Sequence, residues 1–154
     1  LGDVYKRQTL ISGFPGETQE DHEELMEFVD EIEFDRLGVF PYSAEEDTPA
    51  ATMEDQIPEE VKEARRDEIM ELQQEISLEK GESRVGQVLT VMIEGKVSGE
   101  SAYIGRTYGD APKVDGYIFV QTGELLMTGD FARVRVTGAL EYDLIGELED
   151  EYTE

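Results

Sequence analysis

"TLISGFPGET", residues 9–18, has the character of a buried strand that ends in a tight turn. Its first residues are apolar or β-branched, as strands favour, and two glycines then flank a Phe-Pro pair. Thr18 stands three residues before Asp21, which is the spacing of a capping box at the start of a helix. The stretch predicts a strand over residues 9–13, a glycine turn and the beginning of a helix.

The next residues continue this pattern. Apolar side chains at helical spacing predict an amphipathic helix over residues 19–33, with one face made of His22, Leu25, Met26, Val29 and Ile32. "FDRLGVFPYS", residues 34–43, is typical of a second strand. Strand, helix and strand in this order predict a βαβ unit with parallel strands. One such unit cannot bury both faces of its sheet, so we expect a piece of a larger α/β domain.

The rest of the chain divides into an acidic loop, a long helix and a β-rich region. Residues 43–57 are acidic and predict a loop. A long connecting helix is expected over residues 58–82, with Pro58 as its first residue, Gly81 as its stop and one apolar face of Val61, Ala64, Ile69, Leu72 and Ile76. Five short β-rich runs separated by glycines then follow, up to residue 148. They predict a small five-stranded antiparallel barrel of OB-like size.

The composition is strongly acidic. The 154 residues include 13 Lys and Arg and 38 Asp and Glu, so the net charge is −25. Residues 1–83 carry a net charge of −18 and residues 84–154 carry −7. This balance weighs against binding of a phosphate backbone as the main role and favours a basic protein partner. An acidic surface that serves only solubility is an equally open interpretation.

The chain contains no cysteine. A disulfide framework, a thiolate zinc site, an iron–sulfur cluster and a cysteine nucleophile are therefore excluded within it. No apolar run is long enough to cross a membrane and no signal peptide is recognisable, so we expect a cytoplasmic location. The first residue is Leu1, and residues 1–8 are interpreted as a junction that is not native. Residues 151–154 are interpreted as an acidic tail.

The glycine turn is the first candidate site. Gly13 and Gly16 let the backbone and the start of a helix approach a ligand closely, although the same residues also suit a plain tight turn. The turn lacks both the G-x-G-x-x-G pattern and the lysine of a P-loop, so nucleotide phosphate binding has little support. His22 is interpreted as a residue of the core. Carboxylate runs near residues 20–24 and 45–47 are interpreted as solvated faces rather than a Ca²⁺ or Mg²⁺ site.

The predicted barrel offers two further candidates. Asp110 and Asp115 bracket a short loop, where they can either shape the turn or present fixed carboxylates to a basic partner. Arg133 and Arg135 alternate along one strand and therefore share a face, which is a weak platform for RNA in so acidic a segment.

Several stretches together resemble the C-terminal part of the radical-SAM methylthiotransferases. They are "GFPGETQEDHEELMEFV", "FDRLGVFPYSAEEDTPAA", "PEEVKEARRDEIMELQQEIS", "GRTYGDAPKVDGYIFV" and "GDFARVRVTGALEYDLIGEL", in this order over nearly the whole chain. The resemblance implies the last βαβ strands of a radical-SAM partial TIM barrel over residues 9–57 and a TRAM domain over residues 83–150. His22 stands where the family leads us to expect an aromatic residue.

The resemblance is strongest to the RimO-type branch, which methylthiolates the β-carbon of an aspartate in the small-subunit ribosomal protein uS12. It implies S-adenosylmethionine and two 4Fe-4S clusters in the full-length enzyme, and one wall of the S-adenosylmethionine pocket made of Gly13, Phe14, Pro15, Gly16 and Glu17. It also implies a protein-binding role for Asp110 and Asp115. No catalytic or metal-binding residue is assigned in this chain, which we expect to be inactive without the family's cluster-binding cysteines. A tRNA-directed sibling enzyme and a non-enzymatic acidic adaptor remain open as alternatives.

Overall fold

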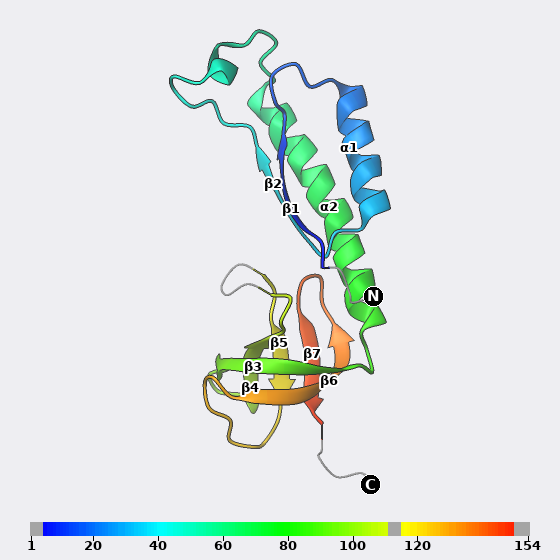
Figure 1. Cartoon of the computed structure of the whole chain (residues 1–154), viewed down its shortest axis with the longest axis vertical. Coiled ribbons are helices and arrows are strands. Elements are labelled where there is room, and N and C mark those ends of the chain that lie inside the picture. Colours follow the sequence, from blue (N-terminus) through cyan, green and yellow to red (C-terminus); the bar gives the residue numbers. More distant parts are fainter. Residues whose placement is uncertain (1–4, 111–114, 150–154) are drawn as a thin grey trace. The chain divides into compact units, whose positions relative to one another are not determined.

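The computed structural model describes residues 5–110 and 115–149, which fall into two units. The first unit covers residues 1–76 and the second covers residues 77–154 (Figure 1). Helix α2 (Glu59–Ser83) crosses the boundary between them. Each unit contains a buried apolar cluster of its own, as separate domains do.

The first unit is a βαβ unit followed by the short 3-10 helix η1 (Pro49–Thr52), which lies within the segment predicted as a loop, and then by a second α-helix. Strands β1 (Arg7–Ser12) and β2 (Arg36–Pro41) pair in parallel, and helix α1 (Gln19–Ile32) connects them. The predicted order of elements and the parallel pairing are therefore confirmed. Strand β1 begins before the predicted strand, because Arg7 and Gln8 pair with β2 although the sequence places them in a junction.

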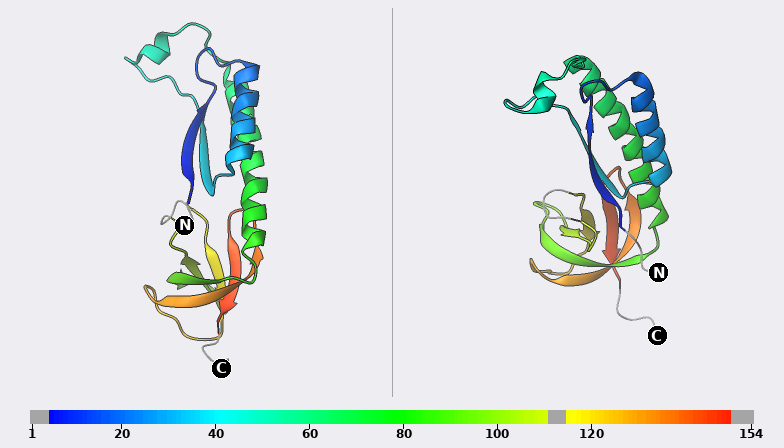
Figure 2. Two further views of the ribbon diagram at one scale, coloured as in Figure 1. Left: turned by 45° about the vertical axis from the view of Figure 1, so that its right-hand side comes forward. Right: turned by 45° about the horizontal axis from the view of Figure 1, so that its top comes forward.

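Both helices of the first unit pack on one face of the two-stranded sheet. Figure 2 shows α1 and α2 side by side. The buried core residues come from these two helices, from β2 and from the segment between α1 and β2: Val29, Phe34, Leu37, Val39, Ile69 and Ile76. The other face exposes Ile11 and Phe40, which are register partners and are 57% and 61% exposed. The sheet thus buries one face only, as the sequence predicts.

Helix α1 begins at the predicted capping box. The Thr18 hydroxyl accepts a hydrogen bond from the Asp21 N–H at 3.1 Å, and the Asp21 carboxylate accepts one from the Thr18 N–H at 2.8 Å. Glu33 ends the helix in the left-handed conformation, with its N–H bonded to the Val29 carbonyl. Local sequence signals are therefore sufficient for this element.

Helix α2 differs from its prediction at both ends. It begins at Glu59, one residue after Pro58, and it runs to Ser83, so Gly81 lies inside the helix and does not end it. A Cβ atom at Gly81 would lie 3.0 Å from the Cβ of Ala139. This close approach within the second unit gives a packing reason for a glycine inside the helix.

The buried face of α2 also differs from the predicted one. Ile69, Leu72 and Ile76 do contribute to the core of the first unit, but Ala64 is exposed. Lys62 and Arg65 are buried in the first turns of the helix instead, along with Gln73 farther on. The spacing of apolar residues predicts the start of the buried face wrongly, because lysine and arginine are expected at the surface.

The second unit is a closed barrel of five strands, as predicted. They are β3 (Val88–Lys96), β4 (Ala102–Arg106), β5 (Ile118–Gln121), β6 (Phe131–Ala139) and β7 (Leu144–Leu148). The order around the barrel is β3-β4-β5-β7-β6. Its interior is filled by Val91, Ile93, Tyr103, Ile118, Val120, Val134 and Val136.

The purely antiparallel arrangement predicted for this barrel is wrong for one strand pair. Strands β5 and β7 are parallel, with Ile118 opposite Leu144. The chain leaves β5, forms β6 against β3 and then reverses once more into β7, so β7 returns to β5 in the same direction.

Candidate functional site

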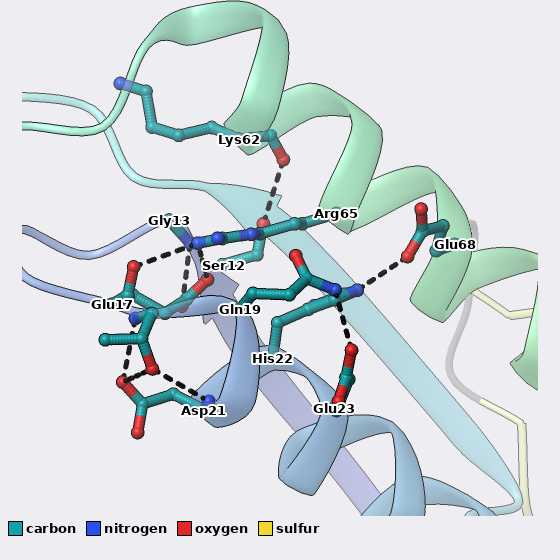
Figure 3. A network of polar contacts seen from close by, with 11 residues as sticks. Ser12, Gly13, Glu17, Gln19, Asp21, His22, Glu23, Lys62, Arg65 and Glu68 are labelled. Atoms are coloured by element: carbon teal, nitrogen blue, oxygen red, sulfur yellow. Dashed lines mark hydrogen bonds and ion pairs between the residues drawn. The ribbon is translucent and has the colours of Figure 1, made fainter.

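The glycine turn between β1 and α1 is held by a buried ion pair (Figure 3). Arg65 of α2 donates from Nη1 to Glu17 Oε1 at 2.8 Å and to the Glu17 carbonyl oxygen at 3.1 Å. The other carboxylate oxygen of Glu17 accepts a hydrogen bond from the Gly13 N–H at 2.9 Å. The side chains of Arg65 and Glu17 are only 10% and 12% exposed. The Glu17 carboxylate therefore links the last residue of the turn to the first, and its ion pair with Arg65 joins the turn to α2.

Lys62 holds the start of the same turn. Its Nζ donates to the Tyr42 carbonyl at 2.8 Å, and its own carbonyl accepts a hydrogen bond from Ser12 Oγ at 3.2 Å. Gly13 has a φ of +72°, and a Cβ atom there would lie 2.1 Å from Lys62 Cγ. The Phe14 ring meets the Tyr42 ring edge-on, with centroids 5.3 Å apart. Both the backbone conformation and the space at position 13 therefore require glycine.

The turn presents apolar surface rather than unused backbone donors. Of the four backbone N–H groups in residues 13–17, those of Gly13, Gly16 and Glu17 already donate within the chain. Pro15 is half-buried. Exposed apolar side chains occur at the end of the sheet and in the turn: Ile11, Phe14 and Phe40. This arrangement suits a planar ring such as adenine better than a phosphate, which needs several N–H donors.

His22 belongs to the core of the first unit, as predicted. It is 1% exposed, and its Nε2 lies 2.7 Å from a carboxylate oxygen of Glu68 on α2. This contact joins α1 to α2 and gives His22 a structural role.

The barrel loop that contains Asp110 and Asp115 is described only at its two ends, since residues 111–114 lie outside the described part. Asp110 is buried and accepts a hydrogen bond from Thr107 Oγ1 at 2.8 Å, while its N–H donates to the Thr107 carbonyl at 3.2 Å. Asp115 is half-buried. Asp110 thus shapes the loop, and contact of either aspartate with a partner stays a prediction.

The far end of this loop packs closely on the turn between β6 and β7. A Cβ atom at Gly116 would lie 1.8 Å from the Tyr142 carbonyl oxygen, and the Tyr117 N–H donates to Asp143 Oδ1 at 2.7 Å. Burial raises the pKa of Tyr142, and the charge of Glu141 raises it further. These contacts fix where the loop rejoins the barrel.

The two arginines of β6 lie on the same face of the strand, as their alternation predicts, and both are exposed. Arg135 is engaged within the barrel, because it pairs with Glu149 and donates to the Gly86 carbonyl at 3.0 Å. Among residues 5–110 and 115–149, no group of three or more His, Asp or Glu side chains is arranged to hold a metal ion. No helix in this described part is long and apolar enough to cross a membrane.

Residues 85–148 match the family model described as the TRAM domain. This part of the chain is a TRAM domain. The chain as a whole is similar to curated proteins named ribosomal protein uS12 methylthiotransferase RimO. The relative from Lachnoclostridium phytofermentans is 60% identical over 97% of this chain and 34% of its own length. Those from Pelotomaculum thermopropionicum and Clostridioides difficile are 56% and 45% identical over 94% and 96% of this chain, in each case 33% of their own length.

These matches confirm the resemblance to the RimO-type methylthiotransferases. The similarity extends beyond the TRAM domain, because each alignment covers at least 94% of this chain. The chain spans about a third of the length of the curated relatives it matches.

Proposed function

We propose that this chain is part of an enzyme that methylthiolates ribosomal protein uS12. The observation that carries the proposal is that relatives with this name match both the βαβ unit and the TRAM domain at 45–60% identity. Such an enzyme replaces a hydrogen on the β-carbon of an aspartate with a methylthio group by radical-SAM chemistry. Its site of action is the cytoplasm, where the ribosome is.

In this proposal the turn from Gly13 to Glu17 forms one wall of the S-adenosylmethionine site. Two observations support it: the Arg65–Glu17 ion pair fixes the turn, and the Phe14 side chain is 43% exposed there. Phe14 and Pro15 contact the adenine end, while Gly13 and Gly16 keep the backbone compact. S-adenosylmethionine and two 4Fe-4S clusters supply the radical chemistry when bound. Because this chain has no cysteine, thiolate ligands for the clusters come from outside it, and the chain alone is inactive.

The TRAM domain is the proposed contact for the basic substrate protein. Residues 84–154 carry a net charge of −7, which complements a basic partner and speeds the encounter. In the loop after β4, Asp110 and Asp115 are the proposed contacts with the partner, and Asp110 also shapes the loop through its hydrogen bond from Thr107. A tRNA-directed enzyme is the second candidate, because Arg133 is exposed on the outer face of β6. A free-standing acidic adaptor is the alternative outside enzymes.

An exchange of segments tests the proposal. In the Lachnoclostridium phytofermentans relative, the 149 aligned residues are replaced by this chain, and the product is reconstituted anaerobically with iron and sulfide. It is then supplied with S-adenosylmethionine, sulfide, a low-potential reductant and either uS12 or tRNA. We expect mass spectrometry to find one methylthio group on an aspartate of uS12, and none when this chain is used alone. Methylthiolation of tRNA instead would assign the chain to the tRNA-directed branch. A chimera inactive on both substrates, beside an active parent, would favour the adaptor.

A further inference from the structure

Strands β5 and β6 are connected by a turn on the barrel (Figure 1). This turn carries apolar side chains that are exposed to solvent. Leu125 is 86% exposed, Met127 is 69% exposed, and Phe131 at the start of β6 is 73% exposed. Leu126, between the first two, is partly buried and packs against the barrel core. Three large apolar side chains within seven residues are thus exposed. They form the apolar turn: Leu125, Met127 and Phe131. Such a concentration on a small domain marks an interaction site.

Hydrogen bonds hold the apolar turn in one conformation. The Met127 N–H donates to Asp130 Oδ2 at 2.8 Å, and the Asp130 N–H donates to the Met127 carbonyl at 3.0 Å. The Leu126 N–H donates to the Tyr103 hydroxyl at 3.1 Å. The turn is also joined to β3, since Thr128 Oγ1 donates to the Glu94 carbonyl at 3.2 Å. A partner therefore meets a turn whose backbone is already ordered, which reduces the entropy lost on binding.

The surroundings of the apolar turn are acidic. Residues 122–131 include Glu124 and Asp130 and no basic residue. Both carboxylate residues are exposed. Phe131 stands opposite the half-buried Met92 in the β3–β6 ladder, which extends the apolar surface onto the barrel wall. An apolar centre with carboxylates beside it complements an apolar patch flanked by lysine or arginine.

We propose that the apolar turn is the anchor by which this TRAM domain binds its basic substrate protein. The inference rests on the proposed function and adds to it: charge brings uS12 to the barrel, and Leu125, Met127 and Phe131 hold it there. Apolar anchors in the centre of an interface carry most of the binding energy, whereas rim charges mainly set the association rate. An RNA partner is disfavoured because the segment has no cation, although Arg133 lies two residues beyond Phe131 on the same face.

The test measures binding of the 154-residue chain to purified bacterial uS12. Leu125→Ser with Met127→Ser removes the anchor, and Val85→Ser with Leu140→Ser is the matched control, since those two side chains are 47% and 48% exposed on the same unit. We expect the first pair to weaken binding at least tenfold through faster dissociation and the control pair to change it less than twofold. All four side chains are exposed, so the circular dichroism and thermal unfolding of both variants should match those of the parent chain.

A salt series separates the anchor from the charges. The tenfold loss should persist from low to physiological ionic strength, whereas Glu124→Gln should change binding only at low salt. Equal binding by the Leu125 and Met127 variant would overturn the anchor while leaving the proposed function intact. Failure of the parent chain to bind uS12 would overturn the anchor and the proposed TRAM contact, while the segment exchange would still decide the proposed function. Tighter binding to a tRNA stem-loop, or a dimer of the chain that the variant abolishes, would assign the apolar turn to RNA or to self-association and reject the proposal.

Discussion

At the scale of single residues, two buried cations of helix α2 hold the glycine turn in place. Lys62 and Arg65 are each only 8% exposed, and the charged group of each has a partner. Lys62 contacts the Tyr42 carbonyl oxygen and the Glu59 carboxylate, and Arg65 pairs with Glu17. The sequence predicts the turn itself, because its glycines and its capping residue are local signals. It does not predict the residues that hold the turn, because they stand about 48 positions later and no local pattern marks them.

The Arg65–Glu17 pair should be a major contributor to the stability of the first unit. Removal of one partner leaves a buried charge, so we expect Arg65→Met or Glu17→Gln alone to lower the free energy of unfolding by roughly 3 kcal/mol. The loss of unfolding free energy in the double variant should be clearly smaller than the sum of the losses in the two single variants. Urea unfolding followed by the helical circular dichroism signal measures this. Arg66→Met is the control, since Arg66 pairs with Asp67 at the surface and should cost less than about 1 kcal/mol. Additive losses would show that the pair is not coupled.

The two glycines of the turn should respond differently to alanine. Both have positive φ, +72° at Gly13 and +86° at Gly16, but only Gly13 faces a close neighbour. Gly16→Ala should cost about 1–2 kcal/mol of unfolding free energy from backbone strain. Gly13→Ala should cost more, because its methyl group would overlap the root of the Lys62 side chain. Urea unfolding of the two variants under identical conditions makes the comparison, and equal losses would contradict the close approach.

At the scale of elements, prediction succeeds where the signals are local. Helix α1 has a capping box and an apolar face at regular spacing, and both agree with the structure. In helix α2, part of the buried face is made of Lys62 and Arg65. The spacing of apolar residues therefore does not predict this part of the face. The five strands of the barrel are each marked by composition and glycines, but the direction in which β5 meets β7 depends on the path of β6, which no single stretch encodes.

The capping box of α1 should make this helix sensitive to acid. Hydrogen bonds from the Thr18 backbone N–H and then its hydroxyl lower the pKa of Asp21. A carboxylate whose pKa is lowered by folding stabilises the fold fully above its ordinary pKa of about 3.9, and this stabilisation is lost as the pH falls through the lower folded-state pKa. Hydrogen exchange of the α1 amides should therefore show a loss of protection below about pH 4 that Asp21→Asn reduces.

Two variants complete this experiment on α1. Thr18→Ala should lower the free energy of unfolding by about 1 kcal/mol at neutral pH, since it removes the cap. Asp30→Asn is the control, because Asp30 is an exposed carboxylate near the C-terminal end of the same helix, where a negative charge is unfavourable. Its effect should be neutral or stabilising. Identical acid sensitivity in the parent, Asp21→Asn and Asp30→Asn chains would place the titrating group elsewhere.

At the scale of the whole molecule, acidic charge is unevenly divided between the two units. Residues 1–76 contain six basic and 23 acidic residues, and residues 77–154 contain seven basic and 15 acidic ones. Self-repulsion of like charges opposes the folded state. The first unit carries the greater excess and leaves one face of its sheet exposed at Ile11 and Phe40, so it has both more repulsion and less burial to offset it.

Added salt should therefore stabilise the chain, and the first unit more than the second. Raising sodium chloride from about 10 to 150 mM shortens the screening length from about 30 to about 8 Å, which weakens repulsion between separated carboxylates. Hydrogen exchange at constant pH reports on both units at once, through core amides such as Val29 in the first and Val91 in the second. A neutral osmolyte at equal osmolality is the control, because it stabilises folded states without screening. We expect the gain in protection at Val29 to exceed that at Val91 in salt but not in the osmolyte. A loss of protection in salt would mean that ion pairs such as Arg65–Glu17 outweigh the repulsion.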